Sequence, residues 1–214
     1  MKKGCILCLL ISVISLPLIA QNIIYSNLKE LLTQHGDTTA VLRVEKRSRN
    51  QIVLTGGADY RITAGDDESM CRRLKKRCFA VRDEKGNLYL NCRKLRYKKL
   101  RFGAWYAPAV QLGKNIYFCA MPLGSVIGGN FVEEDDVKLG GNIGDALAAS
   151  SLVTKRVCYE LNGETGKVDF LGKDRMLQLL KNYPEPKQAY LKDDSQEAKH
   201  TFKYLLELQN KQKK

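Results

Sequence analysis

Cysteine and histidine are the residues of this 214-residue chain that can supply a nucleophile and its base, or hold a metal ion. The two histidines, His35 and His200, lie far apart, and neither has a partner at metal-ligand spacing. A Cys/His pair such as Cys119 with His35 can still meet in the fold, which would give a thiol-dependent hydrolase. We therefore expect no metal site, and we keep the hydrolase as an alternative.

Two glycine-containing stretches resemble nucleotide-binding motifs only in part. Gly163–Lys167 lacks the first glycine of a P-loop, because Leu161 stands there, and a predicted strand follows where the motif needs a helix. Gly140–Gly144 precedes a predicted helix but has no convincing strand before it in a βαβ unit. The acidic run Glu133–Asp136 lacks the alternating ligands of a calcium loop. We expect no cofactor.

The unusual feature is a basic segment from Arg72 to Arg101, which contains thirteen Lys and Arg residues and only two acidic residues. Such side chains can neutralise phosphate or sulfate groups, and the interleaved aromatic residues can stack on bases or sugars. The candidate anion-binding residues are Arg72, Arg73, Lys75, Lys76, Arg77, Arg93, Lys94, Arg96, Lys98, Lys99 and Arg101. The alternative is a solvated face whose aromatic residues point into the core.

Composition supports a folded protein with a basic character. The net charge is +13, charged residues are 28% and hydrophobic residues 44%, which excludes collagen-like, low-complexity and polyelectrolyte chains. A positive net charge of this size is typical of proteins that bind polyanions or anionic surfaces, although it also increases solubility.

The first twenty residues have the pattern of a secretory signal peptide. Lys2 and Lys3 form a basic start, an uncharged apolar run follows, and Ala20 is a suitable residue for cleavage. The run is too short for a membrane span, and none follows it, so we expect no integral span after cleavage. The sequence predicts a soluble exported protein, periplasmic or secreted, with one domain over residues 21–214.

Five cysteines lie beyond the expected cleavage site, an odd number that leaves at least one thiol free or paired between molecules. Arg77–Arg82 and Leu88–Arg93 are predicted to form a hairpin. If its loop has five residues, Cys78 lies opposite Cys92, and the two can form a disulfide. The alternative is five buried thiols that behave as small hydrophobic side chains.

Strands are predicted along most of the chain, with helices towards the end. Ser26 is expected to cap a short first helix, and Asp66 or Asp67 to open another that runs through Arg77. Further predicted strands are Val41–Lys46, Gln51–Thr55, Asp59–Thr63, Leu95–Phe102, Trp105–Leu112, Asn115–Ala120, Lys155–Leu161 and Lys167–Leu171.

The C-terminal part, about residues 174–210, is expected to be helical, with a restart at Pro184 and a capping box from Asp194 to Glu197. Pro122–Gly144 reads as a long irregular connection that leads to a short helix over Asp145–Leu152. These elements predict an α+β fold with a mainly antiparallel sheet built from hairpins.

Several strings, among them Gly56–Ile62, Asn91–Tyr97 and Trp105–Pro108, resemble an uncharacterised family of exported proteins from Bacteroides-type Gram-negative bacteria. The resemblance covers nearly the whole chain beyond the signal peptide. It implies an envelope or secreted location, and it brings no activity, ligand or catalytic residue.

The sequence thus favours a non-catalytic binding module for an anionic polymer or an envelope protein, while an enzyme stays open. Besides the thiol-dependent hydrolase, the second alternative is a structural component of an envelope complex, docked through the Gly124–Gly144 connection.

Overall fold

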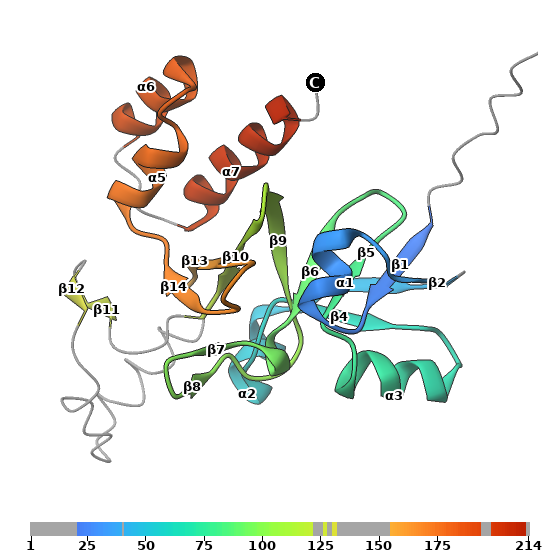
Figure 1. The fold of residues 1–214 in the computed structure, drawn as a ribbon. Helices are drawn as coiled ribbons and strands as arrows, with labels where there is room; N and C mark the ends of the chain where they lie inside the picture. The colour runs from blue at the N-terminus through green and yellow to red at the C-terminus, as the bar shows by residue number, and fades with distance from the viewer. Residues whose placement is uncertain are drawn as a thin grey trace, which may run out of the picture.

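The computed structural model describes residues 21–39, 41–121, 126–127, 130–131, 155–193 and 198–212. A ten-stranded sheet crosses the centre of the molecule (Figure 1). Its main path runs in the order β14 (Val168–Phe170), β13 (Val157–Leu161), β10 (Asn115–Ala120), β9 (Tyr106–Leu112), β6 (Leu88–Asn91), β5 (Ala80–Arg82), β1 (Asn22–Tyr25) and β2 (Asp37–Thr39). All of the strand pairs described in it are antiparallel.

A hairpin of β3 (Arg43–Lys46) and β4 (Tyr60–Thr63) branches from this path. It joins at Tyr106 of β9, which pairs with Tyr60 of β4 on one side and with Asn91 of β6 on the other. Two short hairpins stand apart from the sheet: β7 (Arg96–Tyr97) with β8 (Leu100–Arg101), and β11 (Val126–Ile127) with β12 (Asn130–Phe131).

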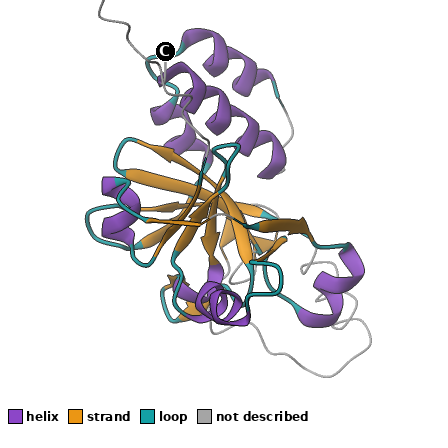
Figure 2. Ribbon diagram, turned by 90° about the vertical axis from the view of Figure 1, so that its right-hand side faces the viewer, coloured by secondary structure: helices purple, strands orange, loops and turns teal. Residues whose placement is uncertain are grey.

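The helices form two groups. Three of them, α1 (Leu28–Thr33), α2 (Arg49–Thr55) and α3 (Glu68–Lys76), alternate with the early strands, and a short 3-10 helix, η1 (Cys92–Lys94), follows β6. Three more, α5 (Lys173–Leu179), α6 (Pro184–Lys192) and α7 (Ala198–Gln212), gather at one end of the sheet (Figure 2). The expectation of an α+β fold with an antiparallel sheet and a helical C-terminal part is confirmed.

Hydrophobic side chains fill both faces of the sheet. On one face, aromatic residues from β10, β13 and the β7–β8 segment pack together, with Phe118, Tyr159 and Phe102 in mutual ring contact. On the other face, α5–α7 cover β9, β10 and β13, while α3 covers β5 and β6 through Leu74. Burying this apolar surface is the main force that holds the helices against the sheet.

Several local predictions are confirmed. Asp67 caps α3 and accepts a hydrogen bond from the amide of Met70, and the last turn of that helix is basic. The β5–β6 hairpin has the expected register, with Arg82 opposite Leu88. The hairpin of β13 and β14 also forms.

Two strand predictions are wrong. The range Leu95–Phe102 contains the short hairpin of β7 and β8, and Gln51–Thr55 belongs to helix α2. The hydroxyl of Ser48 accepts from the amide of Gln51, and the Gln51 side chain accepts from the amide of Ser48, so a capping box starts the helix. Only Ile52 of α2 is buried, so local capping prevails over the β-branched composition. Strand β3 pairs with β4.

The cap of α1 also differs from the prediction. Asn27, not Ser26, is the N-cap, and its side chain accepts from the amide of Glu30. Ser26 instead donates its backbone N–H to the Glu30 carboxylate.

Cys78 and Cys92 are free thiols in the structure, as are the three other described cysteines. The hairpin register is as expected, but the strand pairing ends at Asn91, and Cys92 begins η1. Cys78 packs with Leu74 and Cys92 with Leu90 in a different core cluster. The Cys78–Cys92 disulfide stays a prediction.

The expected signal peptide, the helix over Asp145–Leu152 and the capping box from Asp194 lie outside the described residues, as does most of the Pro122–Gly144 connection.

Candidate functional site

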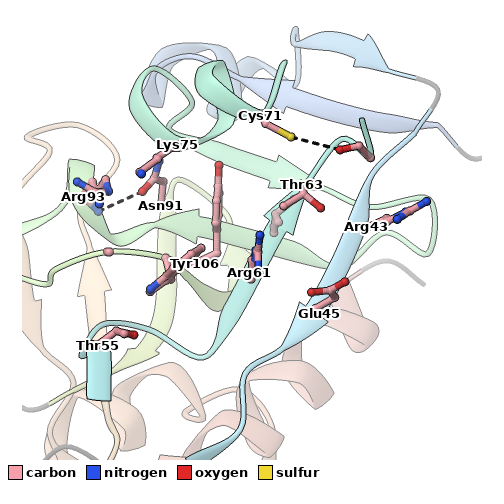
Figure 3. Close-up of a pocket in the computed structure, with 14 residues that line it drawn as sticks. Arg43, Glu45, Thr55, Arg61, Thr63, Cys71, Lys75, Asn91, Arg93 and Tyr106 are labelled. Carbon is pink, nitrogen blue, oxygen red and sulfur yellow. Dashed lines mark hydrogen bonds between the residues drawn. The ribbon is translucent and has the colours of Figure 1, made fainter. Parts of the chain in front are cut away.

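A cavity of about 590 Å³ opens between α3, the β3–β4 hairpin and the segment that follows β6. Its charged lining is one carboxylate, Glu45, and four cations: Arg43, Arg61, Lys75 and Arg93. Figure 3 shows the β3 side chains on one side of the hollow, and Lys75, Asn91 and Arg93 on the other. Elements far apart in sequence therefore bring like charges to one place.

The β3–β4 hairpin supplies two of the cations. Its register pairs Arg43 with Thr63 and Glu45 with Arg61. Because side chains alternate along a strand, these four point to the same face, while Val44 and Ile62 pack towards the core under α3. The alternation places both arginines at the cavity.

The other two cations are positioned through a buried amide. The Asn91 side chain donates to the carbonyl oxygens of Leu74 (3.1 Å) and Cys78 (2.9 Å) and accepts from the amide of Arg93 (3.1 Å). The hydroxyl of Tyr106 donates to the same Leu74 oxygen at 2.8 Å. The C-terminal turn of α3, which carries Lys75, and η1, which carries Arg93, are thus fastened to the same point of the sheet.

Trp105 forms part of the wall in a constrained conformation. Its φ of 76° lies in the left-handed region, which is rare for a bulky residue. The backbone of Gly57 approaches so closely that a Cβ there would lie 2.4 Å from the Ala104 oxygen, so only glycine fits. Backbone strain of this kind persists only where the surrounding structure holds it.

Arg47 helps to hold this strained segment in place. It is 7% exposed, and its guanidinium donates to the carbonyl oxygens of Gly56, Ala58 and Gln51 and to the hydroxyl of Thr55. It also lies 5.0 Å from the centre of the Trp105 ring, and Arg61 lies 5.9 Å from it. Burial lowers the pKa of Arg47, and the nearby Asp59 carboxylate acts in the opposite direction. Arg47 is a structural cation.

None of the four cavity cations is in an ion pair within the described residues, and Arg43, Arg61, Lys75 and Arg93 are all exposed. Glu45 and Arg61 are opposed in the register, yet no ion pair joins this described pair either. The cavity thus presents positive charge that the described part of the chain leaves uncompensated, which suits an anionic group.

The eleven predicted anion-binding residues are found in three places. Lys75 and Arg93 line the cavity. A second hollow of about 500 Å³ on α3 is lined by Arg72, Arg73, Lys76 and Arg77. The remaining residues, exposed on η1 and the β7–β8 hairpin, are Lys94, Arg96, Lys98, Lys99 and Arg101.

The α3 hollow differs from the cavity because two of its cations have partners. Arg73 forms an ion pair with Asp37, and Arg72 lies 4.0 Å from Glu68. Arg43 and Arg61 are the cavity cations that sequence reasoning missed. The alternation of β3 and β4 places them there, but the sequence predicts a strand over Gln51–Thr55, between β3 and its partner β4, which hides this pairing.

No cysteine–histidine pair forms among the described residues. His35 Nδ1 lies 2.6 Å from the Thr33 carbonyl, and His200 Nδ1 lies 2.9 Å from the Asp193 carboxylate. Burial raises the pKa of Cys119 well above its usual value, which opposes formation of a nucleophilic thiolate. Cys71 lines the cavity, but no histidine joins it there.

No group of three or more metal-ligating side chains occurs within the described ranges. None of the helices described there has the length and apolar composition to cross a bilayer.

Comparison with known proteins places the chain in a family without assigning it a role. The model of a family of unknown function, DUF6563, matches residues 23–212. The chain belongs to this family. No curated protein and no solved structure matches it. For this DUF6563 member, function has to be argued from the cavity itself.

Proposed function

We propose that this chain is an exported, non-catalytic binding protein, and that its cavity takes an acidic group of an anionic envelope or extracellular polymer. The observation that carries the proposal is the set of four exposed cations around one carboxylate, none of them in an ion pair within the described residues. A phosphate, sulfate or carboxylate group provides the missing negative charge.

The geometry favours a binding site with fixed walls over basic side chains that are scattered across the surface. Asn91 and Tyr106 fix the segments that carry Lys75 and Arg93, and Arg47 and Gly57 fix the wall at Trp105. Because the backbone segments that carry them are held in place, the cations are presented together to one ligand. The further cations of α3 and the β7–β8 hairpin can add weaker contacts along a polymer.

Export is part of the proposal and rests on the N-terminal pattern of a basic start, an apolar run and Ala20. The chain is expected to reach the periplasm or the exterior, where the cavity would bind an envelope or extracellular polyanion. N-terminal sequencing of protein recovered after export should find Gln21 as its first residue.

The test compares two triple variants of equal net charge. R43Q/R61Q/R93Q removes three cavity cations. K167Q/K173Q/K181Q removes three exposed lysines outside the cavity lining: Lys167 just before β14, Lys173 at the start of α5 and Lys181 between α5 and α6. On sulfated, phosphorylated and carboxylated polymer matrices, the cavity variant should bind about 100-fold more weakly and elute at lower salt. The control variant should behave as the wild type does.

Elution of both variants at the same salt would contradict the proposal, because total charge alone would then explain retention. Tight binding to an acidic envelope protein, with none to the three matrices, would contradict a polymer ligand. Thermal unfolding of both variants checks that the fold is intact.

A further inference from the structure

A pair of cysteines lies on the opposite side of the sheet from the β7–β8 hairpin, away from the cavity residues. Strands β10 and β13 are antiparallel neighbours, and their register puts Cys119 directly opposite Cys158. The two sulfur atoms are 2.7 Å apart, which is about 0.7 Å longer than a disulfide bond of about 2.0 Å. Directly opposed residues in antiparallel strands have Cα separations within the range that disulfides span.

Both side chains are enclosed beneath the C-terminal helices. Cys119 is 7% exposed and Cys158 is 3% exposed. Both Sγ atoms face the Ala198 carbonyl at the start of α7, at 3.8 Å and 3.4 Å respectively. Since both sulfur atoms lie on the same face of the sheet and against the same backbone group, forming the bond requires little movement.

We infer that Cys119 and Cys158 form a disulfide in the exported protein, which ties β10 to β13 under α7. The remaining cysteines beyond the expected signal peptide, Cys71, Cys78 and Cys92, then stay as thiols, which accounts for the odd number. This bond has a different place in the fold from the Cys78–Cys92 pairing that the sequence suggests.

The oxidant is a disulfide of another thiol compound, either a small molecule or a protein of the export pathway. The thiolate of one cysteine attacks a sulfur of that disulfide, forms a mixed disulfide and releases one thiolate. The second cysteine then attacks the mixed disulfide and releases the other thiolate. The two thiol protons pass to the two released thiolates, so the oxidant leaves as two thiols.

The disulfide between Cys119 and Cys158 forms during folding, before the protein reaches its folded state. The two sulfurs are enclosed once α7 has packed, so an external disulfide reaches them only before that. The bond closes a long loop, because 38 residues separate its two ends in the sequence. Closing such a loop restricts the unfolded chain and raises the unfolding temperature.

Peptide mapping of the full chain, recovered after export without reductant, tests this inference. The protein is denatured, its thiols are alkylated, and it is digested without reduction. We expect one linked peptide pair containing Cys119 and Cys158, two hydrogen atoms lighter than the sum of the separate peptides. Cys71, Cys78 and Cys92 should carry the alkyl group.

Alkylation of Cys119 and Cys158 before reduction would overturn the inference, as would a linked pair containing Cys78 and Cys92. Wild type that is unfolded with reductant and refolded in its presence should have a Tm about 10 °C lower than the oxidised protein. C119S/C158S should show no such response, and C71S, as the matched control, should respond as the wild type does. If C119S/C158S does not fold, the peptide map of the wild type still decides.

Discussion

The cavity and the helix-covered face of β10 and β13 differ in whether their charged side chains have partners. At the cavity, Arg43, Arg61, Lys75 and Arg93 gather without an ion pair within the described residues. On β13, the single carboxylate of Glu160 is fully engaged. It accepts from Arg175 at 2.8 Å and 2.7 Å, from Asn115 at 2.6 Å and from Tyr117 at 3.1 Å.

This difference separates structural from functional charge. A half-buried carboxylate loses hydration and needs such partners, so the Glu160 cluster stabilises the fold. Cations that are exposed and crowded repel one another and contribute little to folding. Their arrangement around a built cavity is therefore better explained by a ligand than by stability.

The largest contrast in stability is expected between Glu160→Gln and Arg93→Gln. The first leaves Arg175 without its carboxylate partner and should lower the free energy of unfolding by about 2 kcal/mol. The second removes an unpaired cavity cation and should change it by less than about 0.5 kcal/mol. Urea denaturation at pH 7 measures both, and equal losses would break the distinction between the two regions.

A pH series sharpens the same contrast. Burial alone would raise the pKa of Glu160, but the hydrogen bonds and charge of Arg175 outweigh it and hold that pKa below its ordinary value of 4.5. The stabilisation is therefore complete above pH 4.5 and is lost as the pH falls through the lowered pKa. The difference in unfolding free energy between wild type and Glu160→Gln should shrink in that acidic window. A constant difference from pH 7 to pH 3 would contradict this origin.

The smallest effect is expected at an exposed ion pair on the neighbouring hairpin turns. Lys114 and Glu164 lie 2.7 Å apart, but their side chains are 77% and 67% exposed. Glu164→Gln should leave the free energy of unfolding unchanged within the error of urea denaturation at physiological salt, because both charges stay hydrated. A loss comparable with that of Glu160→Gln would mean that burial does not govern the strength of these pairs.

Local features of this fold could be predicted from the sequence, and non-local ones could not. The register of β5 and β6 follows from a five-residue loop, and the acidic start and basic end of α3 mark its bounds. By contrast, α2 depends on the capping box at Ser48, and the β-branched residues that follow lead the sequence to predict a strand there.

The cavity and the cysteine pair illustrate the same limit. Lys75 and Arg93 belong to the basic segment that stands out in the sequence, but Arg43 and Arg61 reach the cavity only through the pairing of β3 with β4. The sequence predicts strands around both Cys119 and Cys158, yet their position opposite each other depends on a pairing between strands that are far apart in the sequence. No local pattern encodes such a register.

Trp105, the only tryptophan of the chain, lies in the cavity wall and makes the most direct test available. Its fluorescence should be followed while a short sulfated oligosaccharide or polyphosphate is added, with calorimetry in parallel. We expect a saturable change in the wild type and in K167Q/K173Q/K181Q, and about 100-fold weaker binding in R43Q/R61Q/R93Q. Binding detected by calorimetry with no change at Trp105, or with equal affinity in the cavity variant, would contradict the cavity as the binding site.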